Sequence, residues 1–346
     1  MFLWIASFAI IFSFVNGQND CFYIELLNGH SMPRIGLGTY KVQPNQVAST
    51  IESAVKIGYR HFDLAPSYGN EEAIGKVFSE LFAKGYDRSN FFITTKLGSP
   101  ALRASDVPKA VERSLRILGI GYIDMYLIHH AFGTKRTKDF DWFKYKNGSL
   151  ALDYTTDHIA VWKALEHQVW AGKIRSLGLS NFNQSQILRI WNNSWIKPSN
   201  IEMEVNVYIQ QQRFVDWCQD LGMVVTAYSP LGSDDTTRFR RKRQAITLPS
   251  QLEHPLVIHI AEKHGRTPAQ ILLRYSYQRN IVVIPKSTNP ERIAENLNIF
   301  DFELDQNDMG RLRNLDQHGK YKKFDYSTLK GVRSHPEFPY VTSLAD

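Results

Sequence analysis

The sequence predicts an α/β fold, a (β/α)8 barrel with long loops after its fourth and seventh strands and a C-terminal loop. From residue 35 onward, short apolar runs alternate with longer segments whose apolar residues recur every three or four positions. Eight such runs occur, and polar residues lie at the end of almost every one. The chain has 346 residues, more than the roughly 250 that this barrel needs, which leaves room for insertions.

The expected strands are short and rich in aliphatic and aromatic residues, as strands buried on both faces require. They occupy residues 35–37, 59–62, 91–95, 123–128, 174–179, 201–205, 223–227 and 281–284. Helical periodicity between them covers residues 46–57, 71–84, 106–118, 159–171, 184–191, 211–221 and 255–264. A further helix begins after the last strand and continues through Glu295 and Asn296. For eight parallel strands in a chain of this length, we expect closure into a barrel instead of an open sheet.

Three segments lack this alternation of strand-like and helix-like patterns: residues 131–157 after the fourth strand, residues 233–253 after the seventh, and the tail beyond residue 316. The first is polar and rich in aromatic residues. Loops that follow barrel strands stand on the catalytic face, so these segments are expected to act as lids and specificity loops. The second contains a basic run at residues 238–243, which suits a solvated lid, a processing-protease site at residues 240–243 or a polyanion-binding patch.

Composition excludes some classes of protein. Hydrophobic residues make up 43% and charged residues 22%, which is typical of a globular protein and not of a disordered one. The formal net charge of +7 suits an anionic ligand, a phosphorylated cofactor or simply a basic surface. Nucleic acid is not expected as a partner, because Phe239 alone supplies a stacking aromatic in the basic run.

The first residues predict a secretory route. Residues 1–17 are apolar and uncharged and end with small residues, as a cleaved signal peptide does. This run is shorter than the roughly 20 apolar residues of a membrane-spanning helix. We therefore expect residues 18–346 to form one domain that is secreted into an extracellular fluid, with no membrane association after cleavage.

Secretion would expose two kinds of modification site. Sequons begin at Asn147, Asn183 and Asn192, and each is a candidate for a glycan. The two cysteines, Cys21 and Cys218, are too few for a disulfide scaffold. They form either one bridge or two free thiols, and the sequence leaves both open.

Polar residues at the strand ends predict an active site, because the carboxyl ends of the strands meet at one face of the barrel. They come from seven of the eight strands: Asp63; Lys96; His129 and His130; Ser180 and Asn181; Glu202 and Glu204; Tyr228 and Ser229; Lys286 and Ser287.

Four groups near these ends suit the protonation of an alkoxide: Asp63, Tyr68, Lys96 and His129. A free phenol, with a pKa of about 10, is a weak acid at neutral pH, and a nearby ammonium lowers that pKa. A carboxylate holds the ammonium in place, and an imidazole positions the carbonyl oxygen. No metal-ligand spacing occurs, so the carbonyl carbon must receive its electrons as hydride from a nicotinamide cofactor.

The cofactor is predicted to be NADPH. Lys286, Ser287, Thr288 and Arg292 surround the start of a helix, and a helix N-terminus is a ready phosphate site. Two cations favour a dianionic 2′-phosphate over an unmodified ribose. No Gly-x-Gly-x-x-Gly fingerprint follows a strand, so a Rossmann domain is not expected.

The sequence resembles the aldo-keto reductase superfamily from about Met32 to Tyr340. The motifs that match together are GLGTYK at 36–41, HFDLAPSYGNE at 61–71, TK at 95–96, DMYLIH at 124–129, GLSNF at 178–182, AYSPLGS at 227–233, IPKS at 284–287 and EN at 295–296. The resemblance implies that Tyr68 is the catalytic acid, in a tetrad with Asp63, Lys96 and His129.

The resemblance also implies the binding residues. Tyr228 would stack on the nicotinamide, and Ser180, Asn181 and Glu202 would meet its carboxamide. The substrate pocket would include Tyr40, Tyr68, His129 and His130. The cofactor would further contact Gly38, Thr39, Tyr40, Asp63, Ser229, Leu231, Ser233, Lys286, Ser287, Thr288, Arg292, Glu295 and Asn296.

Three departures from the family pattern bear on specificity. Tyr40 stands where many members have tryptophan, and His130 and Ala131 replace a Trp-Pro pair, so we expect a wider, less tryptophan-rich pocket. Glu202 stands where glutamine usually meets the carboxamide. Its carboxylate accepts hydrogen bonds but donates none, unless it is protonated.

These features predict a monomeric, NADPH-dependent reductase of small carbonyl substrates. A secreted member resembles the insect 3-dehydroecdysone 3β-reductases, which implies a ketosteroid substrate. Two alternatives stay open: a broad-specificity aldehyde reductase, and a secreted protein that binds NADPH or a steroid without turning it over.

Overall fold

The computed structural model describes residues 21–232, 249–319 and 322–340. The predicted signal peptide, the basic run and Ser233 lie outside these residues. Within them, eight strands form one parallel sheet in the order β12-β11-β10-β9-β6-β5-β4-β3. They are β3 (Leu37–Gly38), β4 (His61–Asp63), β5 (Phe92–Leu97), β6 (Ile123–Ile128), β9 (Ile174–Ser180), β10 (Asn200–Glu204), β11 (Val224–Tyr228) and β12 (Ile281–Val283).

The sheet closes on itself. Ile35, just before β3, forms a parallel bridge to Val283 of β12, and the Gly36 N–H donates to the Val283 carbonyl at 2.9 Å. Every strand therefore has neighbours on both sides, which satisfies backbone groups that an open edge would leave unpaired. The predicted (β/α)8 barrel is confirmed, and its strands lie where the apolar runs predicted them.

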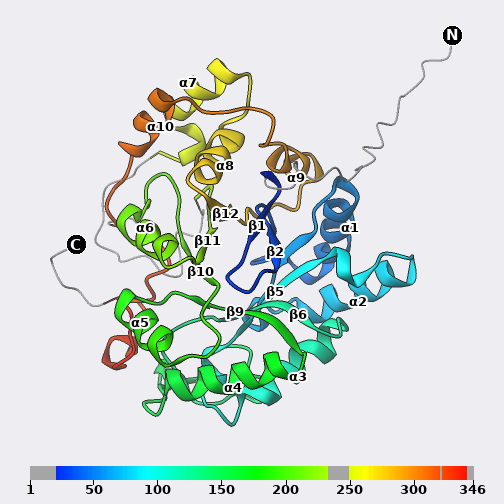
Figure 1. The fold of residues 1–346 in the computed structure, drawn as a ribbon, viewed down its shortest axis with the longest axis vertical. Helices are drawn as coiled ribbons and strands as arrows, with labels where there is room; N and C mark the ends of the chain where they lie inside the picture. The colour runs from blue at the N-terminus through cyan, green and yellow to red at the C-terminus, as the bar shows by residue number, and fades with distance from the viewer. Residues whose placement is uncertain (1–20, 233–248, 320–321, 341–346) are drawn as a thin grey trace.

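Helices surround this ring of strands (Figure 1). They are α1 (Val47–Ile57), α2 (Glu71–Ala83), α3 (Val107–Leu118), α4 (His158–Trp170), α5 (Gln184–Asn193), α6 (Gln212–Asp220), α7 (Pro255–His264), α8 (Pro268–Gln278), α9 (Pro290–Leu297) and α10 (Gln306–Arg313). Short 3-10 turns lie at Pro44–Gln46, Pro66–Tyr68, Arg88–Asn90, Ser99–Ala101, Gln251–Glu253 and Val332–Ser334. The α8 and α10 helices were not among the predicted segments.

Local sequence explains where several helices begin. Asn183 and Gln186 form a reciprocal capping box at the start of α5, and Thr267 and Gln270 do the same for α8. Each cap satisfies backbone N–H groups that a helix start leaves unpaired, and is worth about 1 kcal/mol. The first cap leads the chain from β9 into α5, and the second leads it from α7 into α8.

A hairpin that sequence periodicity did not reveal closes the opposite end of the barrel. Strands β1 (Tyr23–Glu25) and β2 (Ser31–Pro33) pair antiparallel and lie over the centre of the ring in Figure 1. Met32 of this hairpin packs in one buried cluster with Phe92 and Val224, which begin their strands. The N-terminal end of the barrel is thus filled with apolar side chains, and the C-terminal end is left for polar groups.

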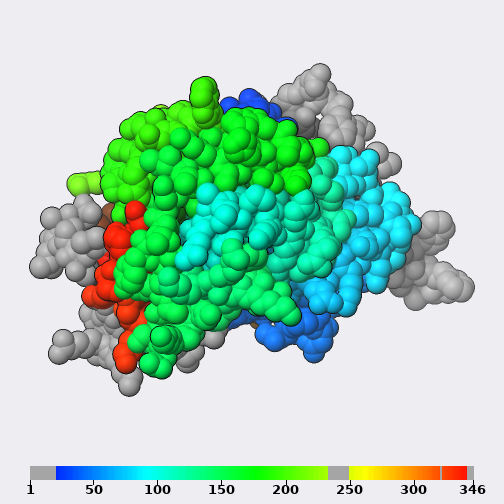
Figure 2. Space-filling view, turned by 90° about the horizontal axis from the view of Figure 1, so that it is seen from below, coloured from blue at the N-terminus to red at the C-terminus, as the bar shows by residue number. Residues whose placement is uncertain are grey.

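The long loop after β6 carries a small antiparallel hairpin of β7 (Tyr145–Lys146) and β8 (Ser149–Leu150). The C-terminal segment packs beside it, since Phe324, Tyr326 and Val332 share a buried cluster with Leu150. In Figure 2 this segment, in red, lies along the green surface of the middle of the chain. The predicted loop after β6 and the predicted C-terminal loop therefore cover the same end of the barrel.

Two further findings concern membrane-spanning helices and the two cysteines. Among the described residues, no helix is long and apolar enough to span a bilayer. Cys218 is a buried free thiol in α6, and Cys21 is exposed. The structure therefore has no disulfide between these two residues, which resolves the alternative that the sequence left open.

Candidate active site

The centre of the site is a buried ammonium group at the carboxyl ends of the strands. Lys96 of β5 donates from Nζ to both carboxylate oxygens of Asp63, at 2.7 and 2.6 Å. It also donates to the Leu64 carbonyl at 3.0 Å and to the Tyr68 hydroxyl at 3.2 Å. The Lys96 side chain is 0% exposed and that of Asp63 4%. Burial acts to lower the pKa of Lys96, but Asp63 and Glu202 outweigh it, so the pKa is raised and the ammonium stays charged.

His129 completes the predicted group of four. It follows β6, and its ring lies edge-on to that of Tyr68, with the centroids 5.9 Å apart. The His130 ring stacks on the other side of His129 at 4.2 Å. Burial, then His130 and Lys96, lowers the pKa of His129 well below its usual value. The imidazole is therefore neutral at physiological pH, in a form that donates one N–H.

The pKa of Tyr68 differs from the sequence expectation. Local reasoning predicted that Lys96 would lower it. In the structure, burial raises this pKa well above 10.0, and the carboxylates of Asp63 and Glu202 add to the effect. The main physical reason is that burial of the Tyr68 hydroxyl disfavours the charged phenolate, and the negative charge of Asp63 adds to this effect.

These groups open into a cleft of about 490 Å³. One end of the cleft is aromatic, and the far end is defined by the start of α9. Asp63, Tyr68 and His129 line the cleft as well, whereas the buried Lys96 does not. Its walls include Gly38, Tyr40, Asp63, Tyr68, His129, His130, Trp142, Phe143, Asn181, Glu202, Tyr228, Ser229, Leu231, Lys286, Ser287, Thr288, Arg292, Phe324 and Tyr326.

The middle of the cleft is organised by one asparagine. Asn181 adopts a left-handed conformation with φ of 59°, which asparagine tolerates better than most residues. Its amide donates to the His129 carbonyl at 3.0 Å, and its Oδ1 accepts from the Tyr228 hydroxyl at 2.8 Å and from Tyr340 at 3.2 Å. This network fixes the ring of Tyr228 beside the cleft.

The far end holds the predicted phosphate site. Lys286 and Arg292 are exposed, and both line the cleft. Between them, the Asn289 side chain caps α9 by accepting from the Arg292 N–H at 2.9 Å, while Pro290 opens the helix. Gly38 lies against this segment, and a Cβ there would meet the Ile284 carbonyl at 2.8 Å, so only glycine fits.

Four residues predicted to bind the cofactor do not line the cleft. Thr39 is buried, and its hydroxyl donates to the Asp63 carbonyl at 2.7 Å. Ser180 is buried and accepts from the Asn181 amide at 3.0 Å. Glu295 accepts from Thr267 at 2.5 Å, and Asn296 is buried in α9. Thr39 and Ser180 therefore support residues that do line the cleft, while Glu295 ties α9 to α8.

The aromatic end contains residues that sequence reasoning missed. Besides Tyr40 and His130, its walls are Trp142, Phe143, Phe324 and Tyr326, from the loop after β6 and the C-terminal segment. Tyr326 packs edge-on against His130 at 4.7 Å. The wider pocket expected from Tyr40 and His130 in place of tryptophan is thus partly filled. The aromatic richness of the first loop was the available signal.

Two acidic residues of β10 face the same region. Glu202 is buried, and its Oε1 lies 3.4 Å from Lys96 Nζ. Glu204 is buried, and its Oε2 accepts from the backbone N–H groups of Lys323 and Phe324 at 2.9 and 3.0 Å. Glu204 thus ties the C-terminal segment, which carries part of the aromatic wall, to the barrel.

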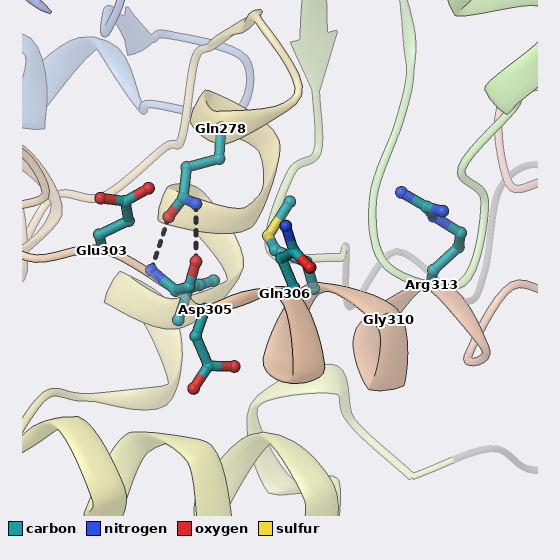
Figure 3. Close-up of a pocket in the computed structure, with 8 residues that line it drawn as sticks. Gln278, Glu303, Asp305, Gln306, Gly310 and Arg313 are labelled. Carbon is teal, nitrogen blue, oxygen red and sulfur yellow. Dashed lines mark hydrogen bonds between the residues drawn. The ribbon is translucent and has the colours of Figure 1, made fainter.

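A larger hollow lies elsewhere, between α8 and α10 (Figure 3). It measures about 830 Å³ and is lined by exposed side chains such as Glu303, Asp305 and Arg313. Gln278 is held there by two hydrogen bonds to the backbone of Leu304. None of the predicted site residues lines this hollow, so the smaller cleft is the candidate active site.

Comparisons with known proteins agree with this geometry. The model of the "Aldo/keto reductase family" matches residues 34–317. Aldo-keto reductase family 1 member A1 of Cricetulus griseus is 39% identical over 323 residues, covering 92% of this chain and 98% of that protein. The human protein of that name is 38% identical over 324 residues, covering 92% and 97%. The solved aldose reductase from Schistosoma japonicum has a TM-score of 0.83 at 36% identity, covering 93% and 99%.

Glu204 supports a prediction about pH and stability. Burial raises the pKa of Glu204 from 4.5 to about 7, although its backbone hydrogen bonds and the nearby lysines act to lower it. A raised carboxyl pKa favours the folded state at low pH, and this contribution is lost as pH rises through about 7. We expect Glu204→Gln, which never ionises and still accepts a hydrogen bond, to be more stable than wild type at alkaline pH, by up to about 3 kcal/mol.

The measurement is the free energy of unfolding in urea at about pH 5 and about pH 8. The matched control is Glu262→Gln, at an exposed residue of α7. Its difference from wild type should change little with pH. A Glu204→Gln difference that is equally flat would show that the buried carboxyl does not titrate in this range.

Proposed function

This chain belongs to the aldo/keto reductase family, and on that premise we propose that it reduces aldehydes with an apolar or aromatic body, with Tyr68 as the acid. It is an NADP-dependent oxidoreductase that acts on small carbonyl compounds. The observation that carries the proposal is the 3.2 Å contact from Lys96 Nζ to the Tyr68 hydroxyl, in a cleft with aromatic walls.

The chain's own residues would act as follows. His129, as a neutral imidazole, would donate an N–H to the carbonyl oxygen and hold it beside Tyr68. Tyr68 would give its proton to that oxygen as negative charge develops there. Lys96 would stabilise the tyrosinate that remains, and Asp63 holds Lys96 in position. NADPH supplies the hydride when it is bound.

The residues along the cleft fit this cofactor. Lys286 and Arg292, at the start of α9, offer two cations for the 2′-phosphate. Tyr228 offers a ring face, and Asn181 holds that ring in place. Ser229 and Leu231 also line the cleft. Thr39, Ser180, Glu295 and Asn296 do not line it in this structure, and their contacts with the cofactor stay a prediction.

The aromatic end favours a compact substrate. Tyr40 lies 5.2 Å from the Tyr68 ring and 6.3 Å from that of Phe324, so the rings close around the reacting position. Tyr326 fills space beside His130. A flat or short apolar body fits between these rings without displacing the C-terminal segment, which supports broad-specificity aldehyde reduction.

A ketosteroid such as 3-dehydroecdysone is the second candidate. The observation that favours it is the Nε2 of His130, which is buried and has no hydrogen-bond partner among the described residues. A large apolar substrate with a second polar group would supply one. The resemblance of a secreted chain to insect 3-dehydroecdysone 3β-reductases supports the same substrate.

We also propose that the chain is secreted as a monomer. Cleavage of residues 1–17 would leave one reductase domain at residues 18–346. One chain supplies all four residues of the predicted tetrad, which supports a monomer as the active unit. The signal-peptide pattern of the sequence supports the extracellular location.

The first test replaces Tyr68 by phenylalanine. We expect Tyr68→Phe to lower kcat by about 100- to 10,000-fold, because the acid is lost while the ring remains. NADPH binding, measured by fluorescence, should be retained. The control is Tyr23→Phe in the β1–β2 hairpin at the other end of the barrel. Full turnover by Tyr68→Phe would exclude Tyr68 as the acid.

The same assay decides between the substrates. NADPH consumption is followed with a simple aromatic aldehyde and with 3-dehydroecdysone. Higher kcat/KM for the aldehyde supports the compact-substrate proposal, and a strong preference for the ketosteroid would replace it by the second candidate.

The second test concerns the phosphate site. We expect Arg292→Met to weaken NADPH binding by about 10- to 100-fold, because charge-assisted hydrogen bonds worth about 1.5–3 kcal/mol are lost. NADH lacks the 2′-phosphate, so its affinity should not change. Arg311→Met, at an exposed position of α10, is the control. Equal losses for both cofactors would place the phosphate elsewhere.

The third test concerns secretion and the sequons. Asn147 is exposed in the turn between β7 and β8, and Asn192 is exposed at the end of α5. Asn183 caps α5 through Oδ1, and its Nδ2 donates to the Pro339 carbonyl at 3.2 Å, so a glycan on Nδ2 would compete with the packing of the C-terminal segment at Pro339. We expect the protein recovered from the medium of eukaryotic cells to begin at Gln18 and to carry glycans at Asn147 and Asn192 only.

Mass spectrometry of the secreted protein checks this expectation. Asn147→Gln should lose the mass of one glycan and Asn183→Gln none. Retention inside cells with residues 1–17 intact would contradict secretion.

A further inference from the structure

Behind Tyr68, one ammonium group lies between two carboxyl groups. Asp63 receives hydrogen bonds from Lys96 Nζ at both oxygens, and Glu202 approaches the same nitrogen at 3.4 Å. The Glu202 side chain is 3% exposed, so it has almost no contact with solvent. Both carboxyl groups therefore approach one buried nitrogen. Glu202 is therefore a fifth ionisable group beside the four residues of the predicted tetrad.

Two carboxylates in contact inside a protein do not both ionise easily. Like charges at short range disfavour the second ionisation, and a hydrogen bond between two carboxyl groups requires a proton on one of them. Asp63 has both oxygens on Lys96, whereas Glu202 has one oxygen at a longer distance. The better-neutralised group is Asp63, so the shared proton belongs on Glu202.

The surroundings of Glu202 agree with this assignment. The ionisable groups that face it are Asp63 of β4, Lys96 of β5, Tyr68 after β4, Tyr228 at the end of β11 and Tyr326 of the C-terminal segment. The phenols are neutral at physiological pH, so Lys96 provides the compensating charge. Burial and Asp63 raise the pKa of Glu202 well above its usual value, with Lys96 acting against them.

We propose that Glu202 is a positioning residue that carries this proton during turnover and thereby leaves Lys96 with one charged carboxylate instead of two. An ionised Glu202 would make Tyr68 a weaker acid, since its charge opposes the formation of phenolate. A neutral Glu202 removes that charge, and Lys96 then acts more strongly on Tyr68. This step rests on the proposed role of Tyr68 as the acid.

The direct test does not depend on turnover. A protonated carboxyl group absorbs in the infrared separately from a carboxylate, so the wild-type spectrum minus that of Glu202→Gln at neutral pH isolates the Glu202 band. We expect a protonated-acid band that persists to alkaline pH. The matched control is Glu204→Gln, two residues along the same strand, which should leave this band in place. A carboxylate band at neutral pH would overturn the proposal.

A kinetic test then measures the consequence. We expect wild-type kcat to fall at alkaline pH as Glu202 ionises, and the fall in Glu202→Gln to lie about one pH unit higher or more, which is about a tenfold difference in rate at the alkaline end. Superimposable profiles would overturn the proposal. If Glu202→Gln does not fold, Glu202→Met supplies the same neutral comparison.

The two proposals fail in different ways. If Tyr68→Phe keeps its activity, the assignment of the acid fails, and the infrared band still reports the proton on Glu202. If Glu202 gives a carboxylate band while Tyr68→Phe is inactive, Tyr68 is retained as the acid and the proposed role of Glu202 is wrong.

Discussion

The buried ammonium of Lys96 is the constraint on which the rest of the site depends. An unpaired charge in a protein interior costs several kcal/mol, so the fold must place compensating groups around it. Strands β4, β5 and β10 bring Asp63, Lys96 and Glu202 into contact across the barrel. The same ammonium holds the Tyr68 hydroxyl at 3.2 Å. The proposed acid is therefore held by the same cation that the carboxyl groups neutralise.

The two ends of the barrel differ: apolar packing at one end stabilises the fold, and the reacting groups lie at the other. At the N-terminal end, the β1–β2 hairpin covers the strands with an apolar cluster around Met32, Phe92 and Val224. At the C-terminal end, polar side chains follow the strands and open into the cleft. Closure through Ile35 and Val283 supplies a rigid frame, because every strand is paired on both sides. Short strands thus suffice to hold the reacting groups in place.

The substrate end depends on two segments that are far apart in the sequence. The loop after β6 contributes Trp142 and Phe143, and the C-terminal segment contributes Phe324 and Tyr326. The C-terminal segment is held to the barrel by Glu204, and farther along, Glu337 accepts hydrogen bonds from Gln186 and Arg189 of α5. Specificity is therefore built from contacts outside the strands, while the reacting groups lie on or beside them.

The sequence by itself determined the barrel and the group of four that includes Tyr68, because both depend on local signals: apolar runs of strand length, and polar residues where those runs end. The tertiary structure alone decided the hairpin plug and the aromatic walls, since these segments have no periodicity and are held by long-range contacts. It also decided the acidity of Tyr68. Sequence reasoning considered only Lys96 as a neighbour of Tyr68, whereas the fold buries the hydroxyl, which is the largest cause of its raised pKa, and places Asp63 and Glu202 near it.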